Sequence, residues 1–420
     1  MNAALSAPIN MKNVLLLAFY FPPRSHIASY RSGCFAKFLP ENGWLPTVVC
    51  ENWPPGRPDY DPDFVGKIPD EVAVHRVDNP VPRGFCQRFF LRKLAPYLWP
   101  HRAPLLWWRK ARAQVLSLLA QKRFDAVWAT SDPLTPWALA EEAAARAGIP
   151  WVADIRDSFN EQQHGSWYKR PLFAFQERRL AVRADRVVAV TRGVAQRLGK
   201  RIGRKIDVIY NGFDPTLFPQ DPPAPSARFT IIYAGSLMLP LRNPAPVFAA
   251  IELCLQQKWI PADEIEIQFY GSDPRVIEQV FPRATGRIPL KVLPRIPHRE
   301  VLRLLMASSV LLMLDNATER DVLPGKIGDY LGAGRPILAF PNAGGELSDI
   351  LARTGTGVAL SGMQEMAGQI RQWFTQWKSG RLLAGIRNEA CIAPFSRRFG
   401  AQQLAGVLDE MAGSVKNRAA

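Results

Sequence analysis

Short apolar segments alternate with longer amphipathic segments along almost the whole chain. In the first half, apolar segments of strand length lie at residues 13–20, 46–50, 72–77, 125–130, 150–155, 186–190 and 207–210. Between them, apolar positions recur at helical spacing near residues 27–41, 104–121, 134–147, 168–184 and 191–199. Near-continuous apolar strands separated by helices are typical of a parallel sheet that is covered on both faces. The pattern therefore predicts a doubly wound α/β domain.

The pattern restarts after a proline-rich segment. Residues 218–229 contain four prolines, which is typical of a linker. Strand-length segments follow at 229–235, 266–271, 290–293, 310–314, 336–340 and 357–360, with helical spacing near 243–257, 298–307, 325–333, 345–353 and 363–378. We predict an N-terminal domain over 1–222, a C-terminal domain over 223–395 and a C-terminal helix over 396–420, for which packing back on the N-terminal domain is one option.

Two doubly wound domains joined by a linker suggest where a ligand binds. Open parallel sheets bind ligands at the carboxyl ends of their strands. The two domains are therefore expected to face each other across a cleft, which suits a reaction between two substrates.

Composition narrows the class of protein. The chain has 420 residues, of which 47% are hydrophobic and 21% charged, and this balance excludes disordered and collagen-like proteins. Its five cysteines form no CxxC pair, which argues against a disulfide framework and a zinc site and favours a reducing compartment. No apolar run approaches the ~18 residues of a membrane-spanning helix, and residues 14–21 are expected to be the first strand, not a signal peptide. We expect a cytoplasmic protein.

Positive charge gathers in the first half of the chain. The formal net charge is +16, and residues 1–222 contribute 31 Lys/Arg against 20 Asp/Glu, or +11. Residues 79–124 hold ten basic residues, no acid and several Phe, Tyr and Trp residues. Such a segment is typical of a surface that rests on anionic lipids, so we expect a peripheral contact with a membrane through residues 83–112. The alternative is an ordinary core-packing helix with a basic outer face. Nucleic acid is not expected, because no nucleic-acid-binding module accompanies these residues.

The segment "DVLPGKIGDYLGAGRPILAF" (321–340) holds two acids eight positions apart, followed by Gly, a basic residue, Pro and a strand. This arrangement resembles the donor-binding domain of the group-1 glycosyltransferases, a large retaining family with the GT-B architecture. Further matches are "YAGS" at 233–236, with Arg242 beyond it, "FYGS" at 269–272 and "PNAGGELSDIL" at 341–351.

The first half resembles the acceptor domain of the same family. The matching segments are "LLLAFYFPP" followed by Arg31, "CFAKFLPENGW", "ADRVVAVTRGVAQRL" and "VIYNGFDPTLF". The chain also departs from the family pattern. Both acids are Asp where the family usually has Glu, Ser25-His26 replaces a glycine pair, and "DIRD" (154–157) replaces a His-Asp pair. The resemblance implies transfer of a hexosyl or related sugar from a nucleotide-diphosphate sugar, with retention of configuration.

The chemistry of that reaction suits the residue types on the donor side. Breaking the bond between a sugar and a diphosphate leaves extra negative charge on the departing group, which cations and backbone N–H groups stabilise. Arg242 can supply a bidentate fork and Lys326 a point charge. Gly344 and Gly345 precede a predicted helix, whose N-terminal N–H groups suit phosphate. The expected donor-binding residues are Gly235, Ser236, Arg242, Gly271, Lys326, Asp329, Gly344 and Gly345.

Two acids receive more specific expectations. Asp329, near the start of the 325–333 helix, is expected to accept hydrogen bonds from ribose hydroxyls. Asp321 is expected to contact the donor sugar or stabilise positive charge at its anomeric carbon. No cluster of metal ligands is apparent, so we expect no metal and no cofactor beyond the nucleotide-sugar substrate.

The acceptor side is expected to involve residues that follow the first and fifth strands. His26, Arg31, Asp154 and Arg156 are candidates for acceptor contacts, and Asp157 is a candidate base; for Asp154 and Arg156 the alternative is a pair of solvated charges. The expected acceptor is a glycan or a lipid-linked intermediate. Two alternatives to a glycosyltransferase stay open: a nucleotide-sugar epimerase of the same architecture, and a non-catalytic partner in glycan assembly that keeps the fold.

Overall fold

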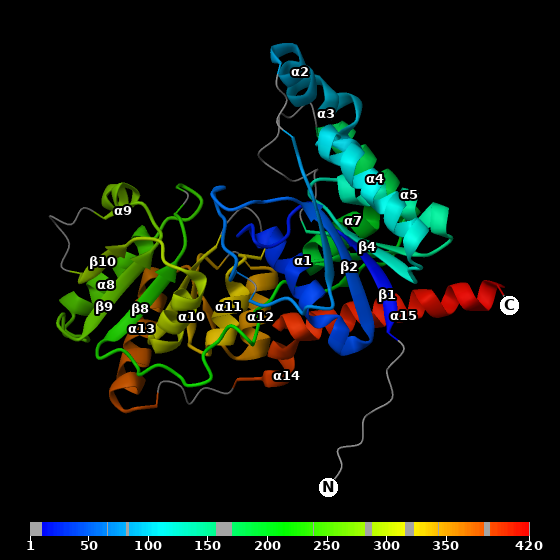
Figure 1. Ribbon diagram of the computed structural model, residues 1–420. Coiled ribbons are helices and arrows are strands. Elements are labelled where there is room, and N and C mark those ends of the chain that lie inside the picture. Colours follow the sequence, from blue (N-terminus) through cyan, green and yellow to red (C-terminus); the bar gives the residue numbers. More distant parts are fainter. Residues whose placement is uncertain are drawn as a thin grey trace, which may run out of the picture. The chain divides into compact units, whose positions relative to one another are not determined.

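The computed structural model describes residues 11–64, 66–80, 84–156, 170–237, 239–281, 288–315, 323–342, 344–381 and 387–419. The chain divides into two compact units. Unit 1 comprises Met1–Asn211 with Arg397–Ala420, and unit 2 comprises Gly212–Ser396. Each unit is built around one sheet (Figure 1).

The described strands of unit 1 form one parallel sheet in the order β3-β2-β1-β4-β5-β6-β7. They are β1 (Lys12–Leu17), β2 (Trp44–Glu51), β3 (Ala73–Val77), β4 (Ala126–Thr130), β5 (Trp151–Ile155), β6 (Arg186–Ala189) and β7 (Asp207–Val208). Its longer helices are α1 (Ile27–Phe38), α4 (Leu105–Gln121), α5 (Thr135–Ala147), α6 (Arg170–Arg183), α7 (Arg192–Ile202) and α15 (Arg397–Ala419). The strand order reverses direction between β1 and β4.

Both faces of this sheet are covered. Leu15 and Leu17 of β1 belong to a core that includes Trp107 of α4 and Trp137 of α5. The alternate residues of β1 point to the opposite face, where α1 and α15 pack together and the ring of Phe35 meets that of Trp128 at 5.2 Å. Burial on both faces explains why the strands are apolar throughout.

Unit 2 repeats the architecture with the strand order β10-β9-β8-β11-β12-β13, again with parallel neighbours. The strands are β8 (Phe229–Ala234), β9 (Ile265–Tyr270), β10 (Leu290–Leu293), β11 (Val310–Leu314), β12 (Ile337–Phe340) and β13 (Gly357–Ala359). The helices are α8 (Ala245–Gln256), α9 (Pro274–Val280), α10 (His298–Ala307), α11 (Ile327–Ala333), α12 (Glu346–Thr354), α13 (Met363–Lys378) and α14 (Glu389–Ile392). Here the order reverses between β8 and β11. The prediction of two doubly wound parallel-sheet domains is confirmed.

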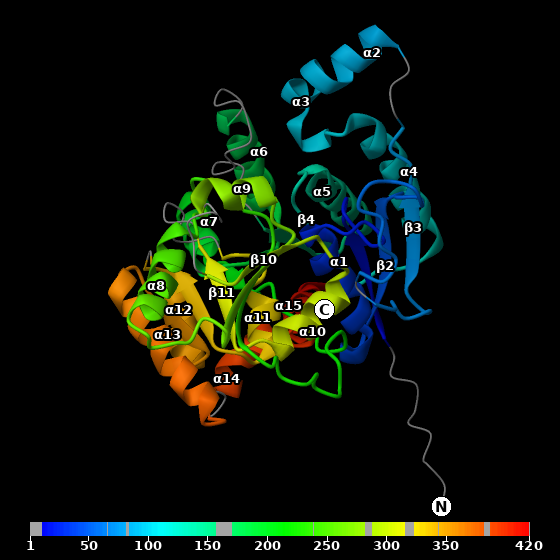
Figure 2. The same cartoon turned by 90° about the vertical axis from the view of Figure 1, so that its left-hand side faces the viewer.

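A broken helical segment precedes α4 in unit 1. It consists of α2 (Phe85–Phe89), a π-helical turn η2 (Phe90–Leu94), α3 (Ala95–Leu98) and a 3-10 turn η3 (Pro100–Arg102). In both views α2 and α3 extend beyond the end of α4, away from the sheet (Figures 1 and 2). The part of the chain that the structure describes contains no helix long and apolar enough to cross a bilayer.

Candidate functional site

The candidate donor site lies in unit 2, where the strand order reverses. Loops at the carboxyl ends of two strands diverge at such a point, and α/β sheets bind ligands there. The loop after β8 carries Gly235 and Ser236. The helix after β11 is α11, which follows Lys326. These predicted donor residues therefore follow strand ends, and their contacts with a ligand stay a prediction.

Lys326 is the most unusual residue at this edge. Its Nζ is shielded from solvent and has no hydrogen-bond partner in the described part of the chain. It lies 3.7 Å from the centre of the Tyr233 ring, a distance at which the ring face attracts a cation. Burial, and after it the charge of Arg242, hold the pKa of Lys326 well below its ordinary value. A buried amine without a carboxylate partner is poised to receive an anion.

Gly235 makes room for this amine. Its φ is +137°, which favours glycine, and a Cβ placed there would lie 2.8 Å from Lys326 Nζ. The loop around it is held by three hydrogen bonds. Gly235 N–H donates to the Tyr270 carbonyl at 2.8 Å, Ser272 Oγ donates to the Gly235 carbonyl at 2.7 Å, and the Tyr233 hydroxyl donates to the Ser236 carbonyl at 3.0 Å. The backbone conformation thus favours glycine, and a side chain at this position would displace the Lys326 amine.

Helix α11 is fixed to the sheet through Tyr330. Its hydroxyl accepts a hydrogen bond from the Ala234 N–H at 3.3 Å and donates to the Leu312 carbonyl at 3.1 Å. These bonds join α11 to the end of β8 and to the middle of β11. Lys326 and Asp329 are three residues apart at the start of this helix, so they lie on neighbouring positions of one face.

Asp329 has a partner that the sequence did not reveal. His298 Nε2, at the start of α10, lies 2.9 Å from Asp329 Oδ2, and about a fifth of each side chain is exposed. The sequence predicted only that a helix begins at this position, over residues 298–307. The contact of His298 with a residue 31 positions away depends on how α10 packs against α11, which a sequence pattern does not encode.

The other predicted donor residues occupy the same edge of the sheet. Gly271 follows β9 with φ +75°, and Gly344 and Gly345, with φ of +67° and +92°, follow β12. Gly345 is the N-cap of α12, as the sequence predicted. Arg242 lies in the loop that leads to α8, close enough for its charge to act on Tyr233 and Lys326. Asp321 lies outside the described residues.

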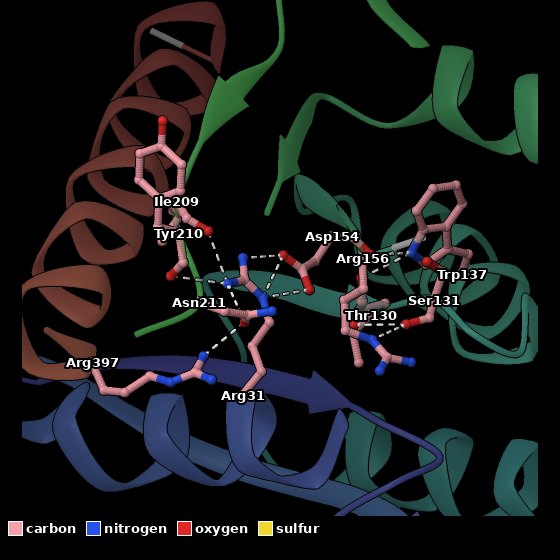
Figure 3. A network of polar contacts seen from close by, with 11 residues as sticks. Arg31, Thr130, Ser131, Trp137, Asp154, Arg156, Ile209, Tyr210, Asn211 and Arg397 are labelled. Atoms are coloured by element: carbon pink, nitrogen blue, oxygen red, sulfur yellow. Dashed lines mark hydrogen bonds and ion pairs between the residues drawn. The ribbon is translucent and has the colours of Figure 1, made fainter. Parts of the chain in front are cut away.

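In unit 1, the predicted acceptor residues separate into two groups. Arg31 and Asp154 form an ion pair of 2.6 Å whose side chains are both fully buried. Arg31 Nη1 also donates hydrogen bonds to the Ile209 carbonyl at 2.9 Å and to Asn211 Oδ1 at 3.3 Å (Figure 3). Arg397 donates to the same Asn211 oxygen at 2.9 Å. This pair therefore joins α1, β5 and the start of α15, and in this structure it offers no surface to an acceptor.

His26 and Arg156 form the second group, at the reversal point between β1 and β4. Arg156 donates from Nε to the Ser131 carbonyl at 2.6 Å and from Nη2 to the Asp132 carbonyl at 3.0 Å (Figure 3). His26 stacks on Tyr20 with ring centres 4.5 Å apart. Loss of water around the ring, followed by the charges of Arg156 and Arg24, lowers the pKa of His26 to about 4. Asp157 lies outside the described residues.

Two members of this second group were missed by the sequence. Arg24 lies over the Tyr20 ring, 4.4 Å from its centre, and forms an ion pair of 2.9 Å with Glu51. Arg24 and Tyr20 both belong to the loop after β1. Their proximity to His26 in the sequence was the only signal that could have identified them. Within the described residues, no group of His, Cys, Asp and Glu side chains could hold a metal ion.

Comparison with known proteins agrees with this architecture. Residues 35–212 match the family described as glycosyl transferase 4-like domain. A comparison with curated protein sequences gives no significant match.

Solved structures match over nearly the whole chain. Sucrose-phosphate synthase from Thermosynechococcus elongatus has a TM-score of 0.65 at 14% identity, covering 96% of this chain and 100% of that one. A putative UDP-N-acetylglucosamine 2-epimerase from Listeria monocytogenes has a TM-score of 0.56 at 13% identity, with coverages of 94% and 95%. WaaG, a glycosyltransferase involved in lipopolysaccharide biosynthesis, has a TM-score of 0.52 at 12% identity, with coverages of 96% and 98%. At these identities the likeness concerns the fold. Residues 35–212 thus match a glycosyl transferase 4-like domain, and the chain as a whole has the GT-B-like fold of two doubly wound parallel-sheet domains.

Proposed function

We propose that the protein transfers a sugar from a nucleotide-diphosphate sugar to the hydroxyl of a glycan or lipid-linked acceptor. The observation that carries this proposal is Lys326, a buried amine beside Arg242 that has no hydrogen-bond partner among the described residues. A nucleoside diphosphate supplies negative charge beside this amine. The domain match to glycosyl transferases supports the same class of reaction.

The reaction breaks the bond between the anomeric carbon and the phosphate oxygen, and forms a bond from that carbon to the acceptor oxygen. The departing nucleoside diphosphate then carries more charge than it did in the donor. Lys326 and Arg242 bind this charge more tightly in the transition state than in the ground state, which lowers the barrier. The N-terminal N–H groups of α12 after Gly345 add a second source of positive potential. A base takes the proton of the acceptor hydroxyl, and Asp157 stays the candidate for this role. Retention of configuration is part of the proposal.

Asp329 and His298 are proposed to hold the nucleoside. The carboxylate accepts hydrogen bonds from the ribose hydroxyls, and the 2.9 Å contact with His298 fixes its orientation. For Asp321 we propose the expected role, a contact with the donor sugar or stabilisation of positive charge at its anomeric carbon.

Release of nucleoside diphosphate tests the proposal. The protein is incubated with UDP-, GDP- and dTDP-sugars, with and without free monosaccharides and polyprenyl-diphosphate-linked glycans, and the released diphosphate is measured. Lys326→Met and Arg242→Ala should each lower turnover by roughly 10- to 100-fold, the worth of a charge-assisted hydrogen bond. Lys378→Met is the matched control, because Lys378 is a surface residue paired with Glu264 and its side chain is 53% exposed. Near-normal turnover in both site variants would contradict the role of the two cations.

The epimerase alternative is tested by the same mixtures. It has support from the fold shared with the epimerase from Listeria monocytogenes. An epimerase changes the sugar of the donor and transfers none to an acceptor, so chromatography of the nucleotide sugars distinguishes the two reactions.

We also propose that the protein acts at an anionic membrane surface, through an apolar arm formed by residues 85–99. Five of its large apolar side chains are exposed: Phe89 by 53%, Phe90 by 38%, Leu94 by 45%, Leu98 by 58% and Trp99 by 37%. The arm has no acidic residue, and Lys93 on it is exposed. Apolar side chains can enter the head-group layer while basic residues meet anionic lipids. A lipid-linked acceptor would be reached there. The sequence predicted a membrane contact over residues 83–112. Because Trp107 of α4 is buried in the core, we limit the proposed contact to the arm before α4.

Vesicle flotation tests the arm. Vesicles of phosphatidylglycerol and phosphatidylethanolamine should carry the wild-type protein upward at low salt. The double variant Phe89→Glu, Leu98→Glu should bind at least roughly tenfold more weakly, because two apolar anchors are lost and two negative charges are added. Phe175→Glu is the control, because Phe175 is 59% exposed on α6, outside the arm. Equal flotation of all three proteins would rule the arm out.

A further inference from the structure

His26 begins α1 as its N-cap. Its backbone is extended, with φ −128° and ψ 145°, and its ring Nδ1 accepts a hydrogen bond from the Ala28 N–H at 3.2 Å. A backbone N–H can only donate, so Nδ1 must offer a lone pair. In the neutral ring the hydrogen therefore lies on Nε2. The tautomer of His26 is thus fixed by the start of a helix.

The surroundings of the ring keep it neutral. Tyr20 stacks on the His26 ring with an angle of 19° between the two planes, and Arg24 lies over Tyr20, 4.4 Å from the centre of its ring. Partial loss of water and the charges of Arg156 and Arg24 hold the pKa of His26 at about 4, while Asp59 opposes them. At neutral pH the ring carries one hydrogen, and that hydrogen is on Nε2.

Nε2 has no hydrogen-bond partner among the described residues, and His26 is exposed. The ring lies in the loop after β1, beside the reversal point of the unit 1 sheet, where α/β domains bind ligands. We infer that His26 is a fixed hydrogen-bond donor, whose Nε2–H binds an oxygen of the acceptor substrate. This inference rests on the proposed function, since it names a contact of the same reaction.

The same geometry excludes His26 as the base that deprotonates the acceptor. A neutral imidazole has one lone pair that can take a proton, and the Ala28 N–H occupies it. Turning the ring to free Nδ1 would give up the helix cap. The oxygen bound at Nε2 is therefore an acceptor of a hydrogen bond, either a hydroxyl or a phosphate oxygen.

Two substitutions separate capping from donation. Asn is among the best N-cap residues, so His26→Asn keeps an oxygen for the Ala28 N–H but removes the donor at the Nε2 position. Gln places an amide N–H farther from the backbone and is a poor cap. We expect His26→Asn to keep the melting temperature and raise the KM for the acceptor roughly tenfold. His26→Gln should keep that KM within about threefold and lower the melting temperature by roughly 2–4 °C. His75→Asn is the control, because His75 lies on β3 beside Gln114.

Histidine NMR gives a readout that does not depend on turnover. With ¹⁵N-histidine label, the protein has five histidines to assign, and His26→Asn identifies the missing one. An Nε2–H tautomer that persists to about pH 5 supports the inference, and an Nδ1–H tautomer overturns it. The KM is measured with the monosaccharide or polyprenyl-linked probe that wild type uses. Unchanged acceptor KM in His26→Asn contradicts the inference alone, whereas wild type that releases no nucleoside diphosphate contradicts the proposed function.

Discussion

The amine of Lys326 is buried, so a positive charge on it is unfavourable as long as no ligand is bound. In the free protein, burial and the neighbouring Arg242 favour the neutral form. The pKa of Lys326 is therefore low, and no described carboxylate offsets the effect. A bound diphosphate would favour the charged form by direct attraction. Donor binding is then coupled to the uptake of a proton.

Calorimetry measures this coupling. Titration of a nucleoside diphosphate into wild-type protein at pH 7.5, in buffers of different ionisation enthalpy, should reveal proton uptake that Lys326→Met lacks. Lys378→Met should behave as wild type. Equal uptake by wild type and Lys326→Met would show that Lys326 does not change its protonation state.

Two histidines should make the free energy of unfolding depend on pH. Burial lowers the pKa of His101 to about 4, with help from Arg102 and Arg179, and His26 has a similar value. The ordinary value of 6.5 applies in the unfolded chain. As the pH falls from about 6.5 to about 4, the unfolded state binds protons first, so stability decreases. Urea unfolding across this range should show a shallower decrease in the double variant His26→Asn, His101→Asn. An identical pH profile would contradict these shifts. Because water reaches the exposed His26, this residue should contribute less than His101 to the pH dependence of the free energy of unfolding.

At the level of single residues, the sequence identified positions better than partners. The hydrophobic pattern showed that Gly235, Lys326 and Gly345 lie at strand ends and helix starts. The resemblance to the glycosyltransferases singled them out, and their contacts with a ligand stay a prediction. The contact of His298 with Asp329 was invisible, since it joins two helices across a packing interface. Arg31 and Asp154 were treated as acceptor contacts for a related reason. They are 123 residues apart, and nothing local shows that one neutralises the other inside the fold.

Helices and strands were predicted to within a few residues because most are buried on a regular face. The helices at 298–307 and 363–378 begin and end at the predicted residues. The short α9 was not predicted, since seven residues give little periodicity. The break at η2 was also missed. A π-helical turn shifts the helical phase by local hydrogen bonding, which leaves no mark in a pattern of apolar residues.

Helix α11 depends on a close approach at Gly328. A Cβ added there would lie 2.5 Å from the carbonyl carbon and 2.7 Å from the Cα of Gly212, both backbone atoms. The backbone cannot move as a flexible side chain would, so Gly328→Ala should lower the free energy of unfolding by about 1–3 kcal/mol. Gly368→Ala on α13 is the matched control, since no atom lies within 4 Å of its added Cβ. It should stabilise by roughly 0.5–1 kcal/mol. Urea denaturation measures both, and a neutral Gly328→Ala would contradict the close packing.

At the scale of the whole molecule, the chain returns to unit 1 for its last helix. The start of α15 is tied by the bond from Arg397 to Asn211, and Asp409 accepts hydrogen bonds from Lys12 at 2.7 Å and from the Trp44 indole at 3.0 Å. The apolar face of α15 is buried, including Leu404, Leu408 and Met411. Unit 1 is thus built from the two ends of the chain, whereas the Lys326 site lies wholly in the continuous segment of unit 2.

Removal of residues 397–420 should therefore affect the two units differently. Loss of Leu404, Leu408 and Met411 from the core removes about 1.5–3 kcal/mol for each side chain, which is comparable to the ~5–15 kcal/mol stability of a whole domain. We expect the truncated protein to lose the near-UV signal of the buried Trp44, Trp107 and Trp128 in unit 1. Limited proteolysis should then cut residues 11–211 and spare residues 212–396.

A nucleoside diphosphate that raises the melting temperature of the full chain should still raise that of the protected fragment, because its candidate contacts remain. A truncated protein whose unit 1 resists proteolysis as before would show that α15 is dispensable for that core. Loss of the ligand-induced shift with unit 2 still folded would show that the binding site extends beyond Lys326 and its neighbours.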